Sequence, residues 1–377
     1  MTIHKTIDPI AELKANVTLP FEQARAMPTS VYTSERFLEA ELAHVFKKDW
    51  FCVGRVSQLK EPGDYLTYEL AGQPVIVIRD QAGELRAMSN VCLHRMSTLL
   101  EGQGNTKSIV CPYHAWTYGL DGRLRGAPAM KQNDGFDRAD YCLPQMRVAD
   151  WMGFLMISLN PDAPDPDQHF HEVTDLVGDY EMGDYVQLWE QRFRWKTNWK
   201  VLAENFMESY HLPVCHQGTI GWTVSLDEMD CPPSPATFNW HSIQKDPSFK
   251  LSVAHPDSTR LSGERRYTTY LLSVYPSLMI TLTPGYFWYL SLHPHGPGEV
   301  DVLYAGGLSP DFMADPEAEV MLEQAKALLD DVNAEDKGCT EKVYRGLCSD
   351  AAVPGHLSHL ERPNYDFAKY LAEKIPG

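Results

Sequence analysis

The sequence predicts an α+β protein of two domains, in which a small antiparallel β domain precedes a larger domain of helices packed on an antiparallel sheet. Short β-rich runs separated by turns that contain Gly or Pro fill residues 50–160. A segment rich in Pro and Asp, residues 160–167, is typical of a linker. The residues after this linker contain both helical patterns and β-rich runs, which favours a domain of helices packed on a sheet.

These observations divide the chain into an N-terminal helical segment over 1–49, a β domain over 50–160 and a larger domain over 161–377. The N-terminal segment is expected to contain a helix from Ser34 to Trp50. Apolar residues recur there at helical spacing, with acidic residues early and lysines late, an order that suits the helix dipole.

The elements of the larger domain follow from periodicity: helices near 168–182 and 198–212, strands over 265–308, and an amphipathic helix from Pro316 onwards. Its least charged stretch, Tyr267 to His293, is long enough to span a bilayer. Prolines, a glycine and many β-favouring residues instead predict two buried strands joined at 283–286.

Composition limits the classes of partner. Apolar residues make up 44% and charged residues 22%, as in an ordinary globular protein. The net charge of -18 argues against binding to nucleic acid or to an anionic membrane surface. Residues 1–20 lack the apolar core and cleavage site of a secretory signal, so we expect a cytoplasmic protein. In that reducing compartment, a close-set pair among the eight scattered cysteines is expected to hold metal.

The strongest motif is Cys92-Leu93-His94, followed after sixteen residues by Cys111-Pro112-Tyr113-His114. Two thiolates and two imidazoles suit either zinc or an iron–sulfur cluster. Zinc sites of this composition usually take both cysteines from one loop and both histidines from another. Here each loop supplies one Cys and one His, which favours a cluster in which one iron takes both cysteines and the other takes both histidines.

With Arg95 beside the first His and Trp116 after the second, this motif resembles the cluster motif of the ring-hydroxylating Rieske non-haem iron oxygenases. Respiratory Rieske proteins carry an additional cysteine in each loop, whereas Met96-Ser97 and Tyr113 stand in that neighbourhood here. The resemblance implies an all-β Rieske domain, whose [2Fe–2S] cluster is held by Cys92, His94, Cys111 and His114. It also implies a catalytic domain of helix-grip, START-like fold with a mononuclear Fe(II).

A second metal site is predicted within residues 198–216. Glu208 and His211 stand three apart on one side of the predicted helix, and Pro213 lets the chain turn before His216. Two His and one carboxylate on one face of Fe(II) leave the opposite positions open for dioxygen. A His pair at this spacing is often structural or exposed, so the assignment of His211 and His216 as iron ligands depends on the cluster motif and on the resemblance.

Helical phase selects Asp336 as the third ligand. The apolar stripe of the late helix consists of Met321, Ala325, Leu328, Leu329 and Val332. At 100° per residue, Asp336 falls within about 40° of three of these positions. Glu335 and Asp331 fall about 100° and 140° away, so both are expected to be solvated. A helix that ended near Asn333 would void this choice, but the resemblance also places the family's carboxylate ligand in a late helix.

The resemblance implies two further roles near the iron. Glu208 matches the carboxylate that, in the family, is hydrogen-bonded between a cluster His of one subunit and an iron His of its neighbour. Asp is usual there, and Glu is similar to members that act on carnitine-like and betaine-like compounds. The alternative is a surface Glu in an ordinary helix pair. Asn205 matches a family residue expected to form hydrogen bonds behind the iron ligands.

The chain has no Gly-x-Gly-x-x-Gly at the head of a helix, so it lacks the signature of a nicotinamide or flavin fold. Electrons are therefore expected from a separate flavin and iron–sulfur reductase, with or without a ferredoxin. The length of the chain suits the homotrimeric members of the family.

Candidate pocket residues are Met207, Trp222, Tyr286 and Trp288, since aromatic side chains could surround a quaternary ammonium group or stack on a ring. Three functions are compatible with the sequence. The first is a terminal oxygenase that hydroxylates a small organic molecule, foremost an aromatic one. The second is the same machinery oxidising a quaternary ammonium compound. The third is a non-catalytic Rieske electron carrier.

Overall fold

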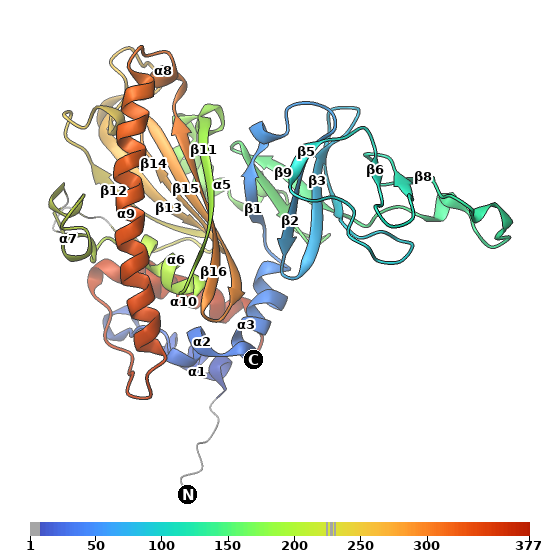
Figure 1. Cartoon of the computed structure of the whole chain (residues 1–377). Helices are drawn as coiled ribbons and strands as arrows, with labels where there is room; N and C mark the ends of the chain where they lie inside the picture. The colour runs from blue at the N-terminus through green and yellow to red at the C-terminus, as the bar shows by residue number, and fades with distance from the viewer. Residues whose placement is uncertain (1–7, 224, 227–228, 230) are drawn as a thin grey trace, which may run out of the picture. The chain divides into compact units, whose positions relative to one another are not determined.

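The computed structural model describes residues 8–223, 225–226, 229 and 231–377. They form two compact units (Figure 1). One unit comprises residues 46–166, and the other comprises residues 8–45 together with 167–377. The part of the predicted N-terminal segment before residue 8 lies outside the described residues.

The unit of residues 46–166 is all β, as predicted, and consists of two antiparallel sheets. The larger sheet has the order β1-β10-β9-β4-β3-β2-β5. Its strands are β1 (Phe51–Arg55), β2 (Asp64–Leu70), β3 (Gln73–Arg79), β4 (Leu85–Ser89), β5 (Gln103–Asn105), β9 (Gln145–Trp151) and β10 (Phe154–Ser158). The smaller sheet consists of β6 (Ile109–Val110), β7 (Thr117–Tyr118) and β8 (Leu124–Gly126).

Cys92 and Cys111 lie in the apolar core between these sheets. They are 1% and 3% exposed, and both pack in a cluster that includes Ile76, Trp116 and Tyr118. The packing of the two cysteines in this core therefore holds the loops that carry them in place.

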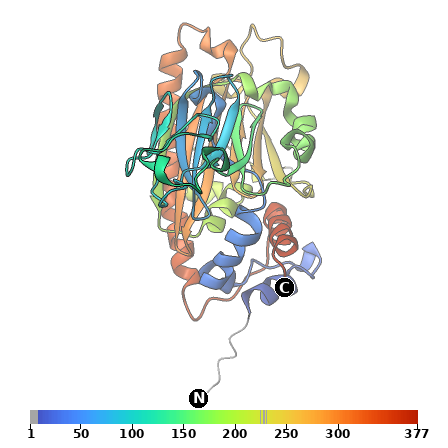
Figure 2. The ribbon, with the colours of Figure 1, turned by 90° about the vertical axis from the view of Figure 1, so that its right-hand side faces the viewer.

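The other unit is built on a six-stranded antiparallel sheet of order β11-β16-β15-β14-β13-β12. Its strands are β11 (Val186–Trp195), β12 (Phe238–Gln244), β13 (Thr268–Val274), β14 (Leu278–Leu282), β15 (Tyr286–Gly296) and β16 (Glu299–Leu308). The α-helices of this part of the chain are α1 (Pro9–Asn16), α2 (Thr29–Thr33), α3 (Glu35–Glu41), α4 (Pro166–His169), α5 (His171–Val177), α6 (Trp199–Met207), α7 (Leu212–Cys215), α8 (Pro310–Met313), α9 (Ala318–Leu347) and α10 (Arg362–Lys374). Figures 1 and 2 show helices and sheet together, which confirms the predicted α+β class.

The strand prediction for Tyr267 to His293 was partly right. β14 and β15 pair across the predicted turn at 283–286, where Leu282 faces Phe287. The segment holds parts of three strands rather than two, because the chain turns between Val274 and Leu278. No helix in the described ranges is long and apolar enough to cross a membrane.

The helix predicted from Ser34 to Trp50 is shorter than expected. Ser34 caps α3 by accepting a hydrogen bond from the Phe37 N–H at 3.3 Å, and a π-helical turn over Leu42–Phe46 follows α3. Trp50 lies beyond this turn, and its indole N–H donates to the Pro164 carbonyl at 2.8 Å. The helical spacing of apolar residues therefore extends to Trp50, although α3 itself ends at Glu41. Tertiary contacts override the local helix propensity after that residue.

A buried ion pair joins the N-terminal helices to α6. Lys200 Nζ lies 2.8 Å from a carboxylate oxygen of Glu41, and both side chains are 0% exposed. Burial lowers the pKa of Lys200 and raises the pKa of Glu41, while the pairing opposes both shifts. Removing one partner would leave an uncompensated buried charge, so the pair fixes α3 against α6.

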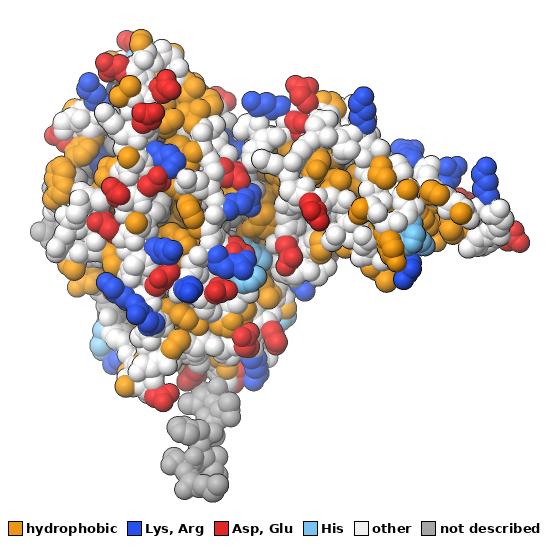
Figure 3. Space-filling model, viewed as in Figure 1, with side chains coloured by type: hydrophobic (Ala, Val, Ile, Leu, Met, Phe, Trp, Pro, Cys, Tyr) orange, Lys and Arg blue, Asp and Glu red, His pale blue; other side chains and the backbone are white. Residues whose placement is uncertain are grey.

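Acidic and basic side chains are interspersed on the face that carries α9 (Figure 3). Lys326 and Asp330, one turn apart on that helix, form an ion pair of 2.6 Å. Despite the net charge of -18, this face therefore presents no continuous acidic surface.

Candidate functional site

The two predicted cluster loops are built alike. In each loop the cysteine N–H donates to the carbonyl five residues later at 2.8 Å, and the N–H four residues later donates back to the cysteine carbonyl at 3.1 Å. Met96 and Ala115 occupy that fourth position, with left-handed φ angles of 54° and 55°. The matching backbone presents Cys and His in the same way from both loops.

The side chains of these loops fit a [2Fe–2S] cluster. The Nδ1 atoms of His94 and His114 are buried, and each lacks a hydrogen-bond partner among the described residues. The two ring centroids are 4.7 Å apart, and Trp116 stacks on the His94 ring at 4.8 Å. Burial raises the pKa of Cys111, but backbone N–H donors in its loop outweigh this effect and lower it, which favours a thiolate.

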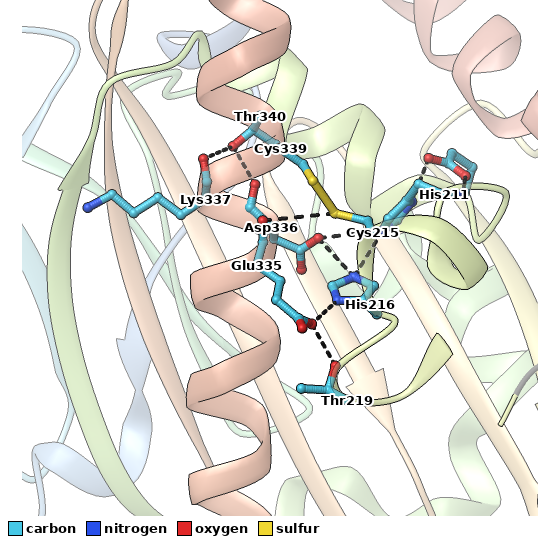
Figure 4. Close-up of a disulfide and its surroundings, with 10 residues drawn as sticks. His211, Cys215, His216, Thr219, Glu335, Asp336, Lys337, Cys339 and Thr340 are labelled. Carbon is cyan, nitrogen blue, oxygen red and sulfur yellow. Dashed lines mark hydrogen bonds and ion pairs between the residues drawn. A yellow bond between two sulfur atoms is a disulfide. The ribbon is translucent and has the colours of Figure 1, made fainter. Parts of the chain in front are cut away.

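Three side chains of the larger unit converge on one point, as Figure 4 shows. His216 Nε2 lies 3.3 Å from His211 Nε2 and 3.1 Å from Asp336 Oδ1. His211 Nε2 lies 3.5 Å from the same oxygen. Ligands about 2.1 Å from a shared ion and at right angles would lie about 3.0 Å apart. The three donors therefore fit a single metal ion, on the two-histidine, one-carboxylate pattern of non-haem iron.

The backbone that brings the histidines together differs from the prediction. Glu208 and His211 were expected on one helix, but α6 ends at Met207 and Glu208 has extended φ and ψ of -130° and 158°. His211 immediately precedes the separate helix α7, and His216 immediately follows it. Pro213 lies in the first turn of α7, where its missing N–H leaves no helical bond unmade.

Asp336 lies where helical phase predicted. Helix α9 continues well past Asn333, and the Asp336 side chain is 14% exposed. The apolar stripe is less regular than expected, because Leu329 and Val332 are buried while Leu328 is 43% exposed. Leu328 nevertheless lines the same cavity as Asp336.

Glu208 holds His211 by two hydrogen bonds. Its Oε1 lies 2.7 Å from His211 Nδ1, and its Oε2 accepts from the His211 backbone N–H at 3.1 Å. Asn205 lies one turn before Glu208, towards the end of α6, and lines the adjacent cavity.

The prediction that Glu335 is solvated was wrong. Its Oε2 lies 2.8 Å from His216 Nδ1 and accepts from the Thr219 hydroxyl at 2.6 Å (Figure 4). Helical phase placed Glu335 to the side of the apolar stripe, and the loop that carries His216 lies on that side. Asp331 is exposed, as predicted.

A disulfide that the sequence does not predict joins the same two segments. Cys215 precedes His216, and Cys339 follows Asp336 by one turn of α9; Figure 4 shows the bond between them. The two cysteines are 124 residues apart in sequence, and nothing in their spacing signals the pairing.

The surrounding carboxylates favour positive charge at this site. Burial lowers the pKa of His211, but hydrogen bonds with Asp336 and Glu208 outweigh it and raise the pKa to about 10. Burial also lowers the pKa of His216, but the hydrogen bond and the charge of Asp336 outweigh it and raise the pKa. A divalent cation at the three ligand atoms would be stabilised in the same way.

A cavity of about 230 Å³ lies beside His211, His216 and Asp336. Helices α6, α7 and α9 form one side of it, and strands β12 to β15 form the other. Its aromatic residues are Phe206, Trp222, Phe249, Tyr286 and Trp288. Three of the four predicted pocket residues are therefore in its wall, whereas Met207 is fully buried elsewhere.

Comparison with known families decides the identity of this arrangement. Residues 181–377 match the ring hydroxylating alpha subunit (catalytic domain) family, and residues 49–147 match the Rieske [2Fe–2S] domain. The chain belongs to the ring-hydroxylating alpha subunit family. It is thus a terminal Rieske oxygenase, an oxidoreductase that uses a Rieske cluster and a mononuclear iron and that requires a reductase partner. The alternative of a non-catalytic electron carrier does not hold.

Relatives within this Rieske oxygenase family match nearly the whole chain in one case and about half of it in another. Choline monooxygenase of Arabidopsis thaliana is 30% identical over 363 residues, which are 93% of this chain and 82% of the relative. Carnitine monooxygenase oxygenase subunit of Acinetobacter baumannii is 34% identical over 205 residues, which are 52% of this chain and 53% of the relative.

Solved structures show the same fold. A quaternary ammonium Rieske monooxygenase in complex with L-carnitine superposes with a TM-score of 0.80 at 23% identity, over 96% of this chain and 99% of the other. Naphthalene 1,2-dioxygenase of Rhodococcus sp. also gives a TM-score of 0.80, at 19% identity, over 97% of this chain and 98% of the other.

Proposed function

We propose that His211, His216 and Asp336 hold the mononuclear iron of this oxygenase, and that Cys92, His94, Cys111 and His114 hold its cluster. The convergence of two Nε2 atoms and one carboxylate oxygen beside an apolar cavity carries the proposal. When bound, the iron supplies dioxygen activation and the cluster supplies electrons.

The chain's own residues orient and enclose the site. Glu208 and Glu335 each engage one histidine Nδ1, which leaves both Nε2 atoms free to bind metal. The aromatic side chains of the cavity wall give the substrate a mostly apolar surrounding. Asn205 lines the cavity one turn before Glu208 and is proposed to form hydrogen bonds behind the ligands.

Glu208 is also proposed as the link to the electron donor, in a homotrimer where a cluster histidine of one subunit meets the iron site of the next. A quaternary ammonium Rieske monooxygenase whose structure concerns inter-subunit electron transfer superposes on 96% of this chain with a TM-score of 0.80. The predicted ferredoxin and the cytoplasmic location stay predictions.

The substrate that we propose is a small quaternary ammonium compound, oxidised at a carbon next to nitrogen. The names of the choline, carnitine and glycine betaine monooxygenases support this class. The aromatic side chains of the cavity can surround such a cation. The second candidate, hydroxylation of an aromatic compound, is favoured by the same wall, because flat rings stack on Trp and Tyr.

His211→Ala tests the metal site. The wild type is expected to hold about three irons per chain, two in the cluster and one outside it. The variant should lose the third iron and all product formation, while the visible spectrum of the cluster stays unchanged. Gln217→Ala, an exposed neighbour of His216, is the matched control and should behave like wild type. A His211→Ala enzyme that keeps three irons per chain would contradict the assignment.

A further inference from the structure

The sheet side of the cavity carries a polar strip made of Lys245, Thr269 and Thr281. Thr269 lies opposite Ile243 in the register of β12 and β13. Lys245, two residues beyond Ile243, donates its N–H to the Tyr267 carbonyl at 2.8 Å and so continues the same pairing. Residues two apart on a strand share a face, so Lys245 and Thr269 are diagonal neighbours within reach of one ligand.

Thr281 extends the strip to a third strand. It lies opposite Leu271, which is two residues beyond Thr269 on β13. Thr281 is therefore the diagonal neighbour of Thr269 on the other side. Three polar side chains, from β13, β14 and the residue that follows β12, thus line one apolar cavity.

The two hydroxyls of the strip have no hydrogen-bond partner within the chain as described. Thr269 is 3% exposed and Thr281 is 6% exposed, and both Oγ1 atoms are buried. A buried hydroxyl without a partner is unfavourable, so native proteins usually satisfy it. A ligand in the cavity is one source of that partner.

The charge of Lys245 is also uncompensated. Among the described residues no carboxylate lies within ion-pair distance of Lys245, and its ammonium is 5.8 Å from the centre of the Phe249 ring. Burial lowers its pKa. The two carboxylates in the cavity wall, Glu208 and Asp336, are engaged by the histidines.

We infer that the substrate carries a carboxylate, which Lys245 binds together with the hydroxyls of Thr269 and Thr281. A carboxylate has two acceptor oxygens, so it can take the ammonium and both hydroxyl donors at once. The inference rests on the proposed function, because this is the cavity beside the iron ligands. Within the proposed classes, it selects betaines and aromatic acids over choline and neutral aromatic compounds.

Two matched pairs of compounds test the inference on the iron-loaded, cluster-containing enzyme. Glycine betaine and choline share a trimethylammonium group and differ in the carboxylate. Benzoate and benzamide share a ring and differ in the charge. Calorimetric titration gives binding, and oxygen uptake with a surrogate reductase gives KM and kcat. At least one carboxylate should bind about tenfold to a hundredfold more tightly than its partner, and the pair that responds identifies the betaine or the aromatic acid.

Variants assign the preference to the strip. Lys245→Met should remove the carboxylate preference mainly through KM, Lys245→Arg should retain most of it, and Thr269→Val should weaken it. Lys245→Glu should favour choline over glycine betaine. The matched control is Lys250→Met, at an exposed lysine on the same connection between β12 and β13, and should leave the preference unchanged. Thermal unfolding of each variant separates a binding effect from loss of fold.

The inference is overturned if neutral partners bind as tightly as both carboxylates, if neither carboxylate binds at millimolar concentration, or if folded Lys245→Met keeps the wild-type preference. Failure of the proposed function is distinguishable, because it would appear as missing iron or as absence of reductase-dependent oxygen uptake.

Discussion

Each of the two histidines that we propose as iron ligands is oriented by a glutamate. Glu208 engages Nδ1 of His211 at 2.7 Å, and Glu335 engages Nδ1 of His216 at 2.8 Å. A carboxylate on Nδ1 fixes the tautomer that leaves Nε2 free for metal, and it raises the basicity of the imidazole. The site therefore relies on two carboxylates that support the ligands, besides the carboxylate of Asp336.

Glu335→Ala is expected to weaken iron binding at the mononuclear site about tenfold to a hundredfold, because His216 loses the group that holds its ring. Competition with an iron chelator, followed by metal analysis, measures the change. The control is Asp331→Ala, an exposed carboxylate one turn earlier on α9. Iron retention equal to wild type in Glu335→Ala would show that the 2.8 Å contact has no role in binding.

The sequence could predict on which side of α9 Asp336 lies, but not the contacts of Glu335. Helical phase reports which side of a helix faces the core, and Asp336 lies on that side of α9. Helical phase carries no information about a loop that lies beside the helix. The two methylene groups of Glu335 reach such a loop, and contact with His216 and Thr219 depends on tertiary structure alone.

At the scale of elements, α7 and α9 are held together twice. Glu335 of α9 bonds to His216, and the disulfide links Cys215 to Cys339. The helix predicted over 198–212 ends earlier, at Met207. Met207 and Glu208 both favour helix locally, so helix propensity did not predict this break. The Glu208 carboxylate instead bonds to the N–H of His211, the residue just before α7, and periodicity does not reveal this contact.

Cys339→Ser is expected to destabilise the larger unit, since a bond that closes a 124-residue separation restricts the unfolded chain. The chain-entropy model gives roughly 4 to 5 kcal/mol for a loop of this size. Thermal unfolding of unreduced protein measures the loss. Dithiothreitol should lower the unfolding temperature of the wild type and leave the variant unaffected. Cys348→Ser, at an exposed cysteine just after α9, should behave like wild type. Insensitivity of the wild type to reduction would contradict the expectation.

At the scale of the whole molecule, hydrophobic periodicity and residue composition predicted an all-β unit and a unit of helices packed on a sheet. The change from helical spacing to short β runs near Trp50 marks the all-β unit, since β1 begins at Phe51. The order of strands was out of reach. β1 pairs with β10 and β11 pairs with β16, contacts between segments about a hundred residues apart that no local pattern specifies.

The stability of the larger unit is expected to fall as the pH drops from about 6.5 towards 4, in part through His293 of β15. Burial lowers the pKa of this 8% exposed imidazole to about 4, although Asp301 opposes the shift. The unfolded chain takes up the proton near pH 6.5, whereas the folded chain resists it, so acid favours unfolding. The full loss of unfolding free energy is on the order of 3 kcal/mol.

His293→Gln should make the unfolding temperature less dependent on pH between 7 and 5. His295→Gln, at a side chain 47% exposed, should not. Equal slopes for His293→Gln and wild type would mean that the proton is taken up elsewhere.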